Sequence, residues 1–272
     1  MKRRRAPAAA VLLLIVIGLG SSAAALAPAR DGMVRIPAGS YVPFLGERDP
    51  DAPPGVVAIV RAAVSVGAFL LDVHPVTNAE FLEFVKRNPR WSRSRVPALF
   101  ADAGYLGHWK SDFDLGEPPF ARAPVTRVSW FAAAAYCRWR GKDLPTVDQW
   151  EYAAYDTGRN AEEIRRRLLA WNSRPNPPSL PEVGSTPRNG YGVADLHGLV
   201  WEWVRDFNSL LVSSEARDDS SSDPNLFCGG GSFASRDPGD YPTFLRFAFR
   251  SSLKAGYTTA NLGFRCGREE EE

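Results

Sequence analysis

The sequence predicts a single α+β domain with much irregular structure, and three observations carry this prediction. Strand-like segments lie near both ends of the chain, and helical segments lie in the middle. Glycine (23), proline (22) and tryptophan (8) are frequent, which favours a loop-rich fold held by aromatic side chains over a helical bundle. The chain has 272 residues, of which 44% are hydrophobic, so one sizeable core can form.

The predicted elements follow in chain order. Alternating apolar residues predict a strand and turn at 33–44 and another strand at 64–76. Thr77 with Glu80, and Thr146 with Gln149, have the spacing of a capping box, so a helix should begin after each threonine. A third helix is expected from Ser129 to Gly141, and a charged helix within 161–171. The end of the chain should return to strands, at 244–253 and 261–267.

The first 27 residues have the pattern of a secretory signal peptide. A basic start, "MKRRR", precedes a short apolar run, and the small residues before position 28 suit cleavage after Ala27. We therefore expect a domain over residues 28–272 in the periplasm or outside the cell. The alternative is an uncleaved N-terminal anchor. No second apolar run has the length of a membrane span.

The charge of the mature chain gives no reason to expect nucleic-acid binding. Removal of residues 1–27 leaves 29 basic and 31 acidic residues, so the net charge changes from +2 to −2. The acidic end, Glu269 to Glu272, is expected to be a solvated tail. We therefore expect the partner to be an exported peptide, protein or small molecule, with no membrane span after cleavage.

Three cysteines, Cys137, Cys228 and Cys266, predict one disulfide and one remaining thiol in an oxidising compartment. Their spacing does not say which two are joined. The glycine-rich stretch "CGGGSF" at 228–233 lacks the lysine of a phosphate-binding loop and precedes no helical pattern. The spacing of Asp195, Gly198, Val200 and Glu202 would allow oxygen ligation of a hard cation such as calcium.

Four ordered sequence blocks resemble the formylglycine-generating enzyme (sulfatase-modifying factor) family. The resemblance covers most of the chain from about Met33 to Cys266 and implies a compact fold with little regular secondary structure, related to the C-type-lectin-like class. The blocks are "DVHPVTNAEFLEFV", "PVTRVSWFAAAAYCRWRGKDLPTVDQWEYAA", "NGYGVADLHGLVWEWVRDF" and "GGGSF…RFAFRSS…NLGFRCG".

The resemblance also implies a disulfide and a calcium site. The family's cysteine pair corresponds to Cys137 and Cys266, whose bond would contribute on the order of 4–5 kcal/mol by constraining the unfolded chain. Cys228 would then stay free. The family's calcium ligands correspond to two side chains and two backbone carbonyls, from Asp195, Gly198, Val200 and Glu202.

The sequence departs from the family at the catalytic cysteines. Active members hold copper(I) with two cysteines and oxidise a substrate cysteine, because soft thiolates suit that ion. Here the first position is Ser235 and the second lies within Asp240 to Pro242, so neither is a cysteine. Formylglycine generation, and copper or iron at that position, are therefore not expected.

Other residues of the family pocket have counterparts in this chain. The resemblance assigns Ser232, Tyr241 and Asn261 to the pocket and Trp201 with Trp203 to its walls. Ser235, Arg236, Asp237 and Asp240 would make the cleft polar and charged, unless this loop is kept only for folding.

Two functions remain open at the level of the sequence. The first is an accessory protein that binds a peptide or partner in the cleft. The second is a diverged periplasmic oxidoreductase, acting in the maturation of a siderophore or metalloenzyme. That enzyme would rely on acid–base groups, or on an iron or copper ion, in place of the cysteine pair. Its acid–base candidates are Asp237, Asp240, His197 and Glu202.

Overall fold

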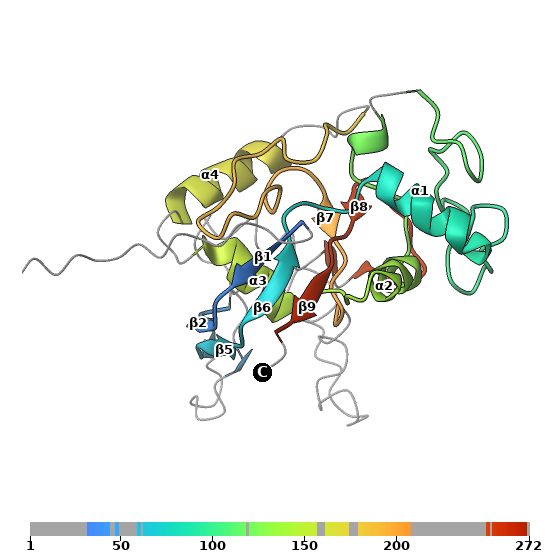
Figure 1. The fold of residues 1–272 in the computed structure, drawn as a ribbon. Coiled ribbons are helices and arrows are strands. Elements are labelled where there is room, and N and C mark those ends of the chain that lie inside the picture. The colour runs from blue at the N-terminus through green and yellow to red at the C-terminus, as the bar shows by residue number, and fades with distance from the viewer. Residues whose placement is uncertain are drawn as a thin grey trace, which may run out of the picture.

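The computed structural model describes most of the chain from residue 32 to residue 270, and its elements lie in the predicted order. The described residues are 32–43, 47–48, 59–60, 62–117, 120–156, 161–173, 179–207, 249–250 and 252–270. The predicted signal peptide and the stretch 208–248 lie outside them. Short strands at both ends and helices between them confirm the α+β prediction (Figure 1).

A three-stranded antiparallel sheet joins the two ends of the domain. Its order is β1 (Met33–Ile36), β6 (Phe69–Asp72) and β9 (Gly267–Glu269). Leu71 of β6 pairs with Val34 on one side and with Gly267 on the other. Buried residues alternate with more exposed ones along β6, as a strand that covers a core on one face requires.

The other strands form three small pairs. β2 (Gly39–Tyr41) pairs with β5 (Val64–Val66), and β3 (Glu47–Arg48) pairs with β4 (Ile59–Val60), both antiparallel. β7 (Trp201–Glu202) and β8 (Leu262–Gly263) run parallel. The predicted single strand at 64–76 is therefore wrong: it divides into β5 and β6, which belong to different sheets. The strand predicted at 244–253 is also wrong where the structure describes it, because residues 249 and 250 are helical.

Four α-helices lie around the sheet in the part of the chain that the structure describes. They are α1 (Asn78–Arg87), α2 (Trp130–Trp139), α3 (Val147–Tyr155) and α4 (Ala161–Asn172). Both predicted capping boxes are confirmed, before α1 and before α3. Short 3-10 turns, η1 (Pro89–Trp91) and η2 (Phe120–Arg122), join the longer elements. Figure 1 shows α1 and α2 on one side of the central strands and α4 on the other.

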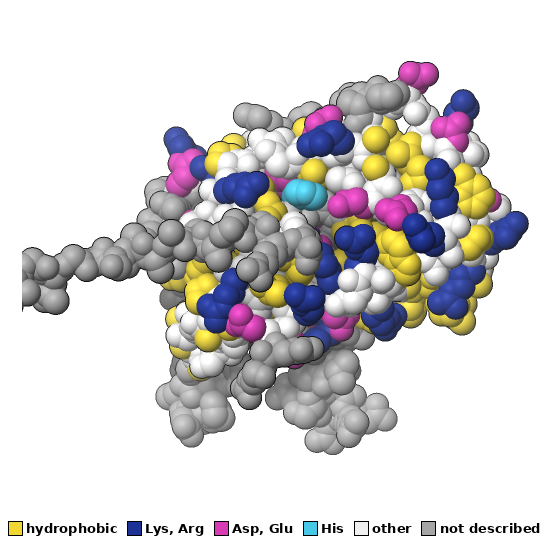
Figure 2. All heavy atoms as spheres, viewed as in Figure 1, with side chains coloured by type: hydrophobic (Ala, Val, Ile, Leu, Met, Phe, Trp, Pro, Cys, Tyr) yellow, Lys and Arg dark blue, Asp and Glu magenta, His cyan; other side chains and the backbone are white. Residues whose placement is uncertain are grey.

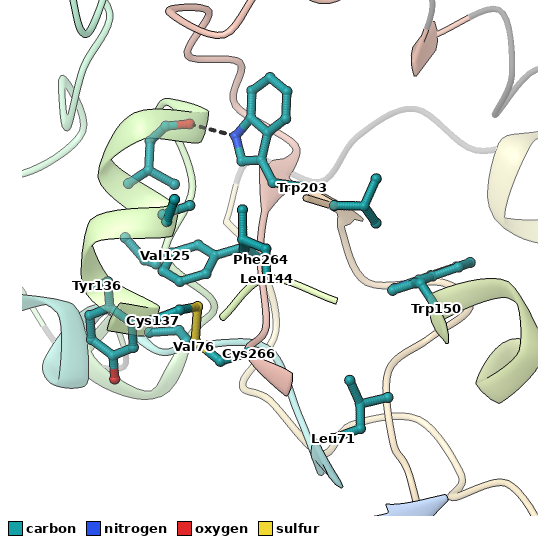
Figure 3. Close-up of a cluster of buried hydrophobic side chains, with 14 of the residues drawn as sticks. Leu71, Val76, Val125, Tyr136, Cys137, Leu144, Trp150, Trp203, Phe264 and Cys266 are labelled. Atoms are coloured by element: carbon teal, nitrogen blue, oxygen red, sulfur yellow. Dashed lines mark hydrogen bonds between the residues drawn. A yellow bond between two sulfur atoms is a disulfide. The ribbon is translucent and has the colours of Figure 1, made fainter. Parts of the chain in front are cut away.

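The predicted disulfide fastens α2 to the C-terminal segment. Cys137 and Cys266 are both buried and are joined by an S–S bond of 1.99 Å. Figure 3 shows this bond beside Tyr136, Phe264 and Val76 in the core. The indole of Trp203 donates a hydrogen bond to the carbonyl of Val128 at 2.9 Å.

Within the described part of the chain, no helix is long and apolar enough to cross a bilayer.

Candidate functional site

The β7–β8 pair positions the described residues of the predicted pocket. The backbone N–H of Trp201 donates to the carbonyl of Asn261 at 2.8 Å, and that of Trp203 donates to the carbonyl of Gly263 at 2.9 Å. Gly263 has to be a glycine, because a Cβ there would lie 2.6 Å from the carbonyl oxygen of Val125. The structure thus brings together Trp201 and Asn261, which are 60 residues apart in the sequence.

An aromatic wall surrounds Trp201. Its ring centroid lies 5.2 Å from that of Trp171 on α4 and 5.2 Å from that of Phe249. All three rings are half-buried, so each presents an apolar edge to solvent. Trp203 is fully buried and supports the core, so it is not a wall of the pocket. The sequence did not indicate Trp171 or Phe249 as partners of Trp201.

Glu202 follows Trp201 on β7 and points into the interior. Its two carboxylate oxygens accept hydrogen bonds from the guanidinium of Arg265, at 2.7 and 2.8 Å. The side chains of Arg265 and Glu202 are 0% and 1% exposed. The indole N–H of Trp150 donates to the same carboxylate at 2.8 Å. This buried pair was not predicted; its sequence signal is an arginine between apolar neighbours in "GFRC".

Arg265 also fixes the backbone around the pair. Its guanidinium donates to the carbonyls of Asp72, Val73 and Ala194 at 3.1, 3.2 and 2.9 Å. These carbonyls come from the end of β6 and from the segment that leads to β7. The Arg265 guanidinium therefore links three parts of the fold. Glu202 supplies the opposite charge that compensates for the hydration that this guanidinium loses on burial.

Asp195, the other predicted acidic calcium ligand, is used by a neighbouring loop. Its carboxylate accepts hydrogen bonds from the backbone N–H groups of Gly184 and of Thr186, the latter at 3.0 Å. Its own N–H donates to the Thr186 hydroxyl at 2.8 Å. Asp195 and Gly198 have positive φ angles of 62° and 108°, so the chain turns sharply between them.

The four residues predicted to bind calcium fit that ion poorly in this arrangement. A guanidinium occupies both oxygens of Glu202 and repels a cation, while backbone amides occupy both oxygens of Asp195. The carbonyls of Gly198 and Val200 would have to supply the remaining ligands. Across the described ranges, no group of three His, Cys, Asp or Glu side chains could hold a metal. Calcium at these residues stays a prediction.

The remaining site predictions fall on two other parts of the chain. Nε2 of His197 lies 3.1 Å from the carbonyl oxygen of Ala154, and its ring packs edge-on against Trp150 at 6.1 Å. His197 and Glu202, two of the acid–base candidates, therefore contact the same indole. The other predicted pocket residues lie outside the described residues: Ser232, Ser235, Arg236, Asp237, Asp240 and Tyr241, together with Cys228.

Comparisons with known proteins match most of the chain to one family model. A sequence model described as sulfatase-modifying factor enzyme 1-like domain matches residues 21–270. The formylglycine-generating enzyme of Streptomyces coelicolor is 30% identical over 88% of this chain and 90% of its own length. A mouse protein named inactive C-alpha-formylglycine-generating enzyme 2 is 28% identical over 88% of both chains.

Among solved structures, PvdO from Pseudomonas aeruginosa matches 88% of this chain and 94% of its own. The identity is 20% and the TM-score is 0.42.

Proposed function

Because the chain belongs to the family of sulfatase-modifying factor enzyme 1-like domains, we propose that it is an exported, non-oxidising member that binds a peptide or partner protein in its cleft. The number of free cysteines supports the proposal that the oxidase chemistry is lost. The chain has three cysteines, and the bond between Cys137 and Cys266 uses two of them.

Only Cys228 is left to supply a thiolate. A copper(I) site of the kind the family resemblance implies needs two thiolates from one chain, because harder oxygen ligands bind this soft ion poorly. Cys137 and Cys266 are buried in the core and joined to each other. The residues present therefore do not fit a copper(I) centre, and we derive no reaction step through one.

The described residues of the predicted pocket support a binding role. Trp201, Trp171 and Phe249 form an apolar wall that is partly open to solvent, and Asn261, directly before β8, pairs with the backbone of Trp201. Aromatic side chains next to a few polar groups are typical of peptide-binding surfaces. A family relative named as inactive is consistent with retention of the fold without the oxidation.

Thiol titration and an oxidase assay test this proposal together. The denatured, non-reduced protein should show one reactive thiol per chain, which peptide mapping should assign to Cys228. With copper(I), oxygen and a peptide substrate of the Streptomyces coelicolor enzyme, the peptide mass should stay unchanged. The Streptomyces enzyme serves as the positive control.

Two results would contradict the proposal. Formation of formylglycine in the peptide would restore the family activity despite the missing thiols. The diverged oxidoreductase would be favoured if the protein consumed oxygen with a thiol or phenolic substrate. It would also have to bind copper or iron and lose that metal when Asp240 or His197 is changed.

Export is a separate part of the proposal. Calcium is a prediction from the family resemblance alone, which the hydrogen bonds of Glu202 and Asp195 do not favour. N-terminal sequencing of protein recovered from the periplasm of an expression host should begin at Pro28. Calorimetric titration of the purified protein with calcium chloride tests the ion at Asp195, Gly198, Val200 and Glu202, and the absence of binding heat would remove it.

A further inference from the structure

A groove on a different part of the molecule combines aromatic walls with arginines. It lies between α1, α2 and the segment that follows α1, and has a volume of about 630 Å³. Asn88 ends α1, where its side-chain amide donates to the carbonyl of Phe84 at 3.0 Å, and Pro89 begins η1. The chain therefore turns away from α1 and leaves space between the turn and α2.

Five aromatic rings line this groove in a continuous arc. Neighbouring ring centroids are 5.6, 6.4, 6.0 and 5.3 Å apart along the arc. Phe84 and Trp91 are buried and form the floor, while the other three are half-buried. The rings in order are those of Trp139, Phe84, Trp91, Phe100 and Phe131. Partly exposed rings in a concave site provide the apolar contact area on which binding energy depends.

Three exposed arginines, Arg90, Arg95 and Arg138, complete the lining, and no acidic side chain takes part in it. None of the three forms an ion pair with an acid in the described part of the chain. The guanidinium of Arg90 lies over the Trp91 ring at 5.3 Å. Arg95 contributes to the lowered pKa of Asp112, although a hydrogen bond from Ser94 is the larger cause. The groove is thus cationic.

The positive charge is local and does not reflect a basic protein. The whole chain has a formal net charge of only +2. Figure 2 shows hydrophobic side chains together with Lys and Arg side chains over the region of α1 and α2, with Asp and Glu side chains among them. At the edge of this region, Leu99 is 79% exposed, next to the groove residue Phe100. An apolar surface ringed by arginines that form no ion pair with a described acid is unusual unless it is covered by a partner.

We propose that this groove, defined by the five rings and three arginines, binds an acidic segment of a partner protein that carries aromatic or large aliphatic anchors. Carboxylates of the segment would pair with Arg95 and Arg138, because arginine offers paired donors that match a carboxylate. The anchors would enter between Phe100, Phe131 and Trp139. The groove shares no residue with the wall at Trp201, so this inference is independent of the proposed function.

The shape of the groove favours a peptide over a membrane surface. A bilayer is engaged by apolar side chains that protrude from a basic surface. Exposed Leu99 could contact a lipid surface, but the rings of Phe84 and Trp91 lie at the bottom of a recess that a flat lipid surface does not reach. A volume of about 630 Å³ is that of a pocket for a few large side chains.

Fluorescence polarisation with synthetic peptides tests the proposal on the full mature chain. The probe is a short labelled peptide in which glutamate alternates with phenylalanine and leucine. Two control probes keep the length, one with lysine in place of glutamate and one with serine in place of the apolar residues. Only the acidic, apolar peptide should bind, and added salt should weaken the binding.

A charge-reversal variant locates the binding site. The double change Arg95→Glu and Arg138→Glu should raise the dissociation constant at least about tenfold, since it removes two attractive charges and adds two repulsive ones. Arg188→Glu, at an exposed arginine outside the groove, is the matched control and should leave binding unchanged. Phe131→Ala should weaken binding without a change in the salt dependence.

Three results would overturn the proposal. Equal binding of the acidic and lysine probes would show that charge does not matter. Equal affinity of the double variant and of Arg188→Glu would place the site elsewhere. Binding to vesicles of anionic lipid, with no binding to the acidic peptide, would assign the groove to a membrane.

Discussion

Charged side chains lie among aromatic rings at two places in this molecule. At one place the charges are buried and paired with each other, and at the other they are exposed and form no ion pair with a described acid. Beside β7, the Arg265 guanidinium and the Glu202 carboxylate are almost fully buried and bind each other at 2.7 Å, with the Trp150 indole alongside. At the α1–α2 groove, Arg95 and Arg138 are exposed and form no ion pair with a described acid.

The difference separates charges that hold the fold together from charges that can bind a partner. A buried ion loses its hydration, so it is tolerated only where an opposite charge and hydrogen bonds replace the water. An exposed arginine keeps its water and needs no internal partner, which leaves it available to a ligand. Thus Glu202 and Arg265 are expected to control stability, and the groove arginines to control binding.

The largest effect is expected from Glu202→Gln. The amide keeps the shape and can still accept from Trp150, but Arg265 becomes an unpaired buried cation. The free energy of unfolding should fall by about 3–5 kcal/mol, as is usual when one partner of a buried pair is removed. Urea denaturation measures this change.

Glu270→Gln is the matched control for that experiment. It makes the same chemical change in a carboxylate that binds Arg35 at 2.7 Å on the surface. Solvent screens such a pair, so no measurable loss of stability is expected. Similar denaturation midpoints for the two variants would show that burial does not distinguish the pairs.

The sequence predicted those features that depend on local chemistry. Both capping boxes could be found because their partners are three residues apart, and the helices began where Thr77 and Thr146 indicated. Cys137 and Cys266 could be paired only through the family resemblance, since their spacing left the choice open.

Features that depend on long-range contacts could not be predicted in the same way. Arg265 meets Glu202 and the end of β6 only because β7 and β8 pair in parallel. The groove needs a helix end at Asn88 and a second helix more than 40 residues later. The hydrophobic periodicity of α1 and of α2 does not indicate that these two helices will lie side by side.

A smaller effect is expected from His108, a half-buried residue that stays uncharged in the folded protein. Its ring packs against Phe120 at 5.1 Å, and its Nδ1 has no hydrogen-bond partner among the described residues. Burial, with a smaller contribution from Arg127 and Arg93, lowers the pKa of His108 to about 4. His108 is therefore a third case beside the buried ion pair and the exposed arginines, because its imidazole stays neutral in the folded protein.

The sign of the pH dependence follows from this lowered pKa. Between its ordinary value near pH 6.5 and about pH 4, the unfolded chain binds a proton that the folded chain does not, so stability falls as the pH falls. From pH 7 to pH 5 the loss due to His108 is about 2 kcal/mol by this linkage. His108→Gln should remove that part of the loss. Urea denaturation of both proteins at the two pH values measures it, and equal losses would contradict the burial of a neutral imidazole.

The smallest change in stability is expected from Arg95→Glu with Arg138→Glu. Both side chains are exposed and form no ion pair with a described acid, so their reversal removes no buried contact. The melting temperature should match that of Arg188→Glu, whereas the affinity for the acidic peptide should differ between the two. A clear loss of stability in the double variant alone would show that these arginines support the fold as Arg265 does. The contrast between the two regions would then fail, because exposure would no longer separate charges used for folding from charges left for a partner.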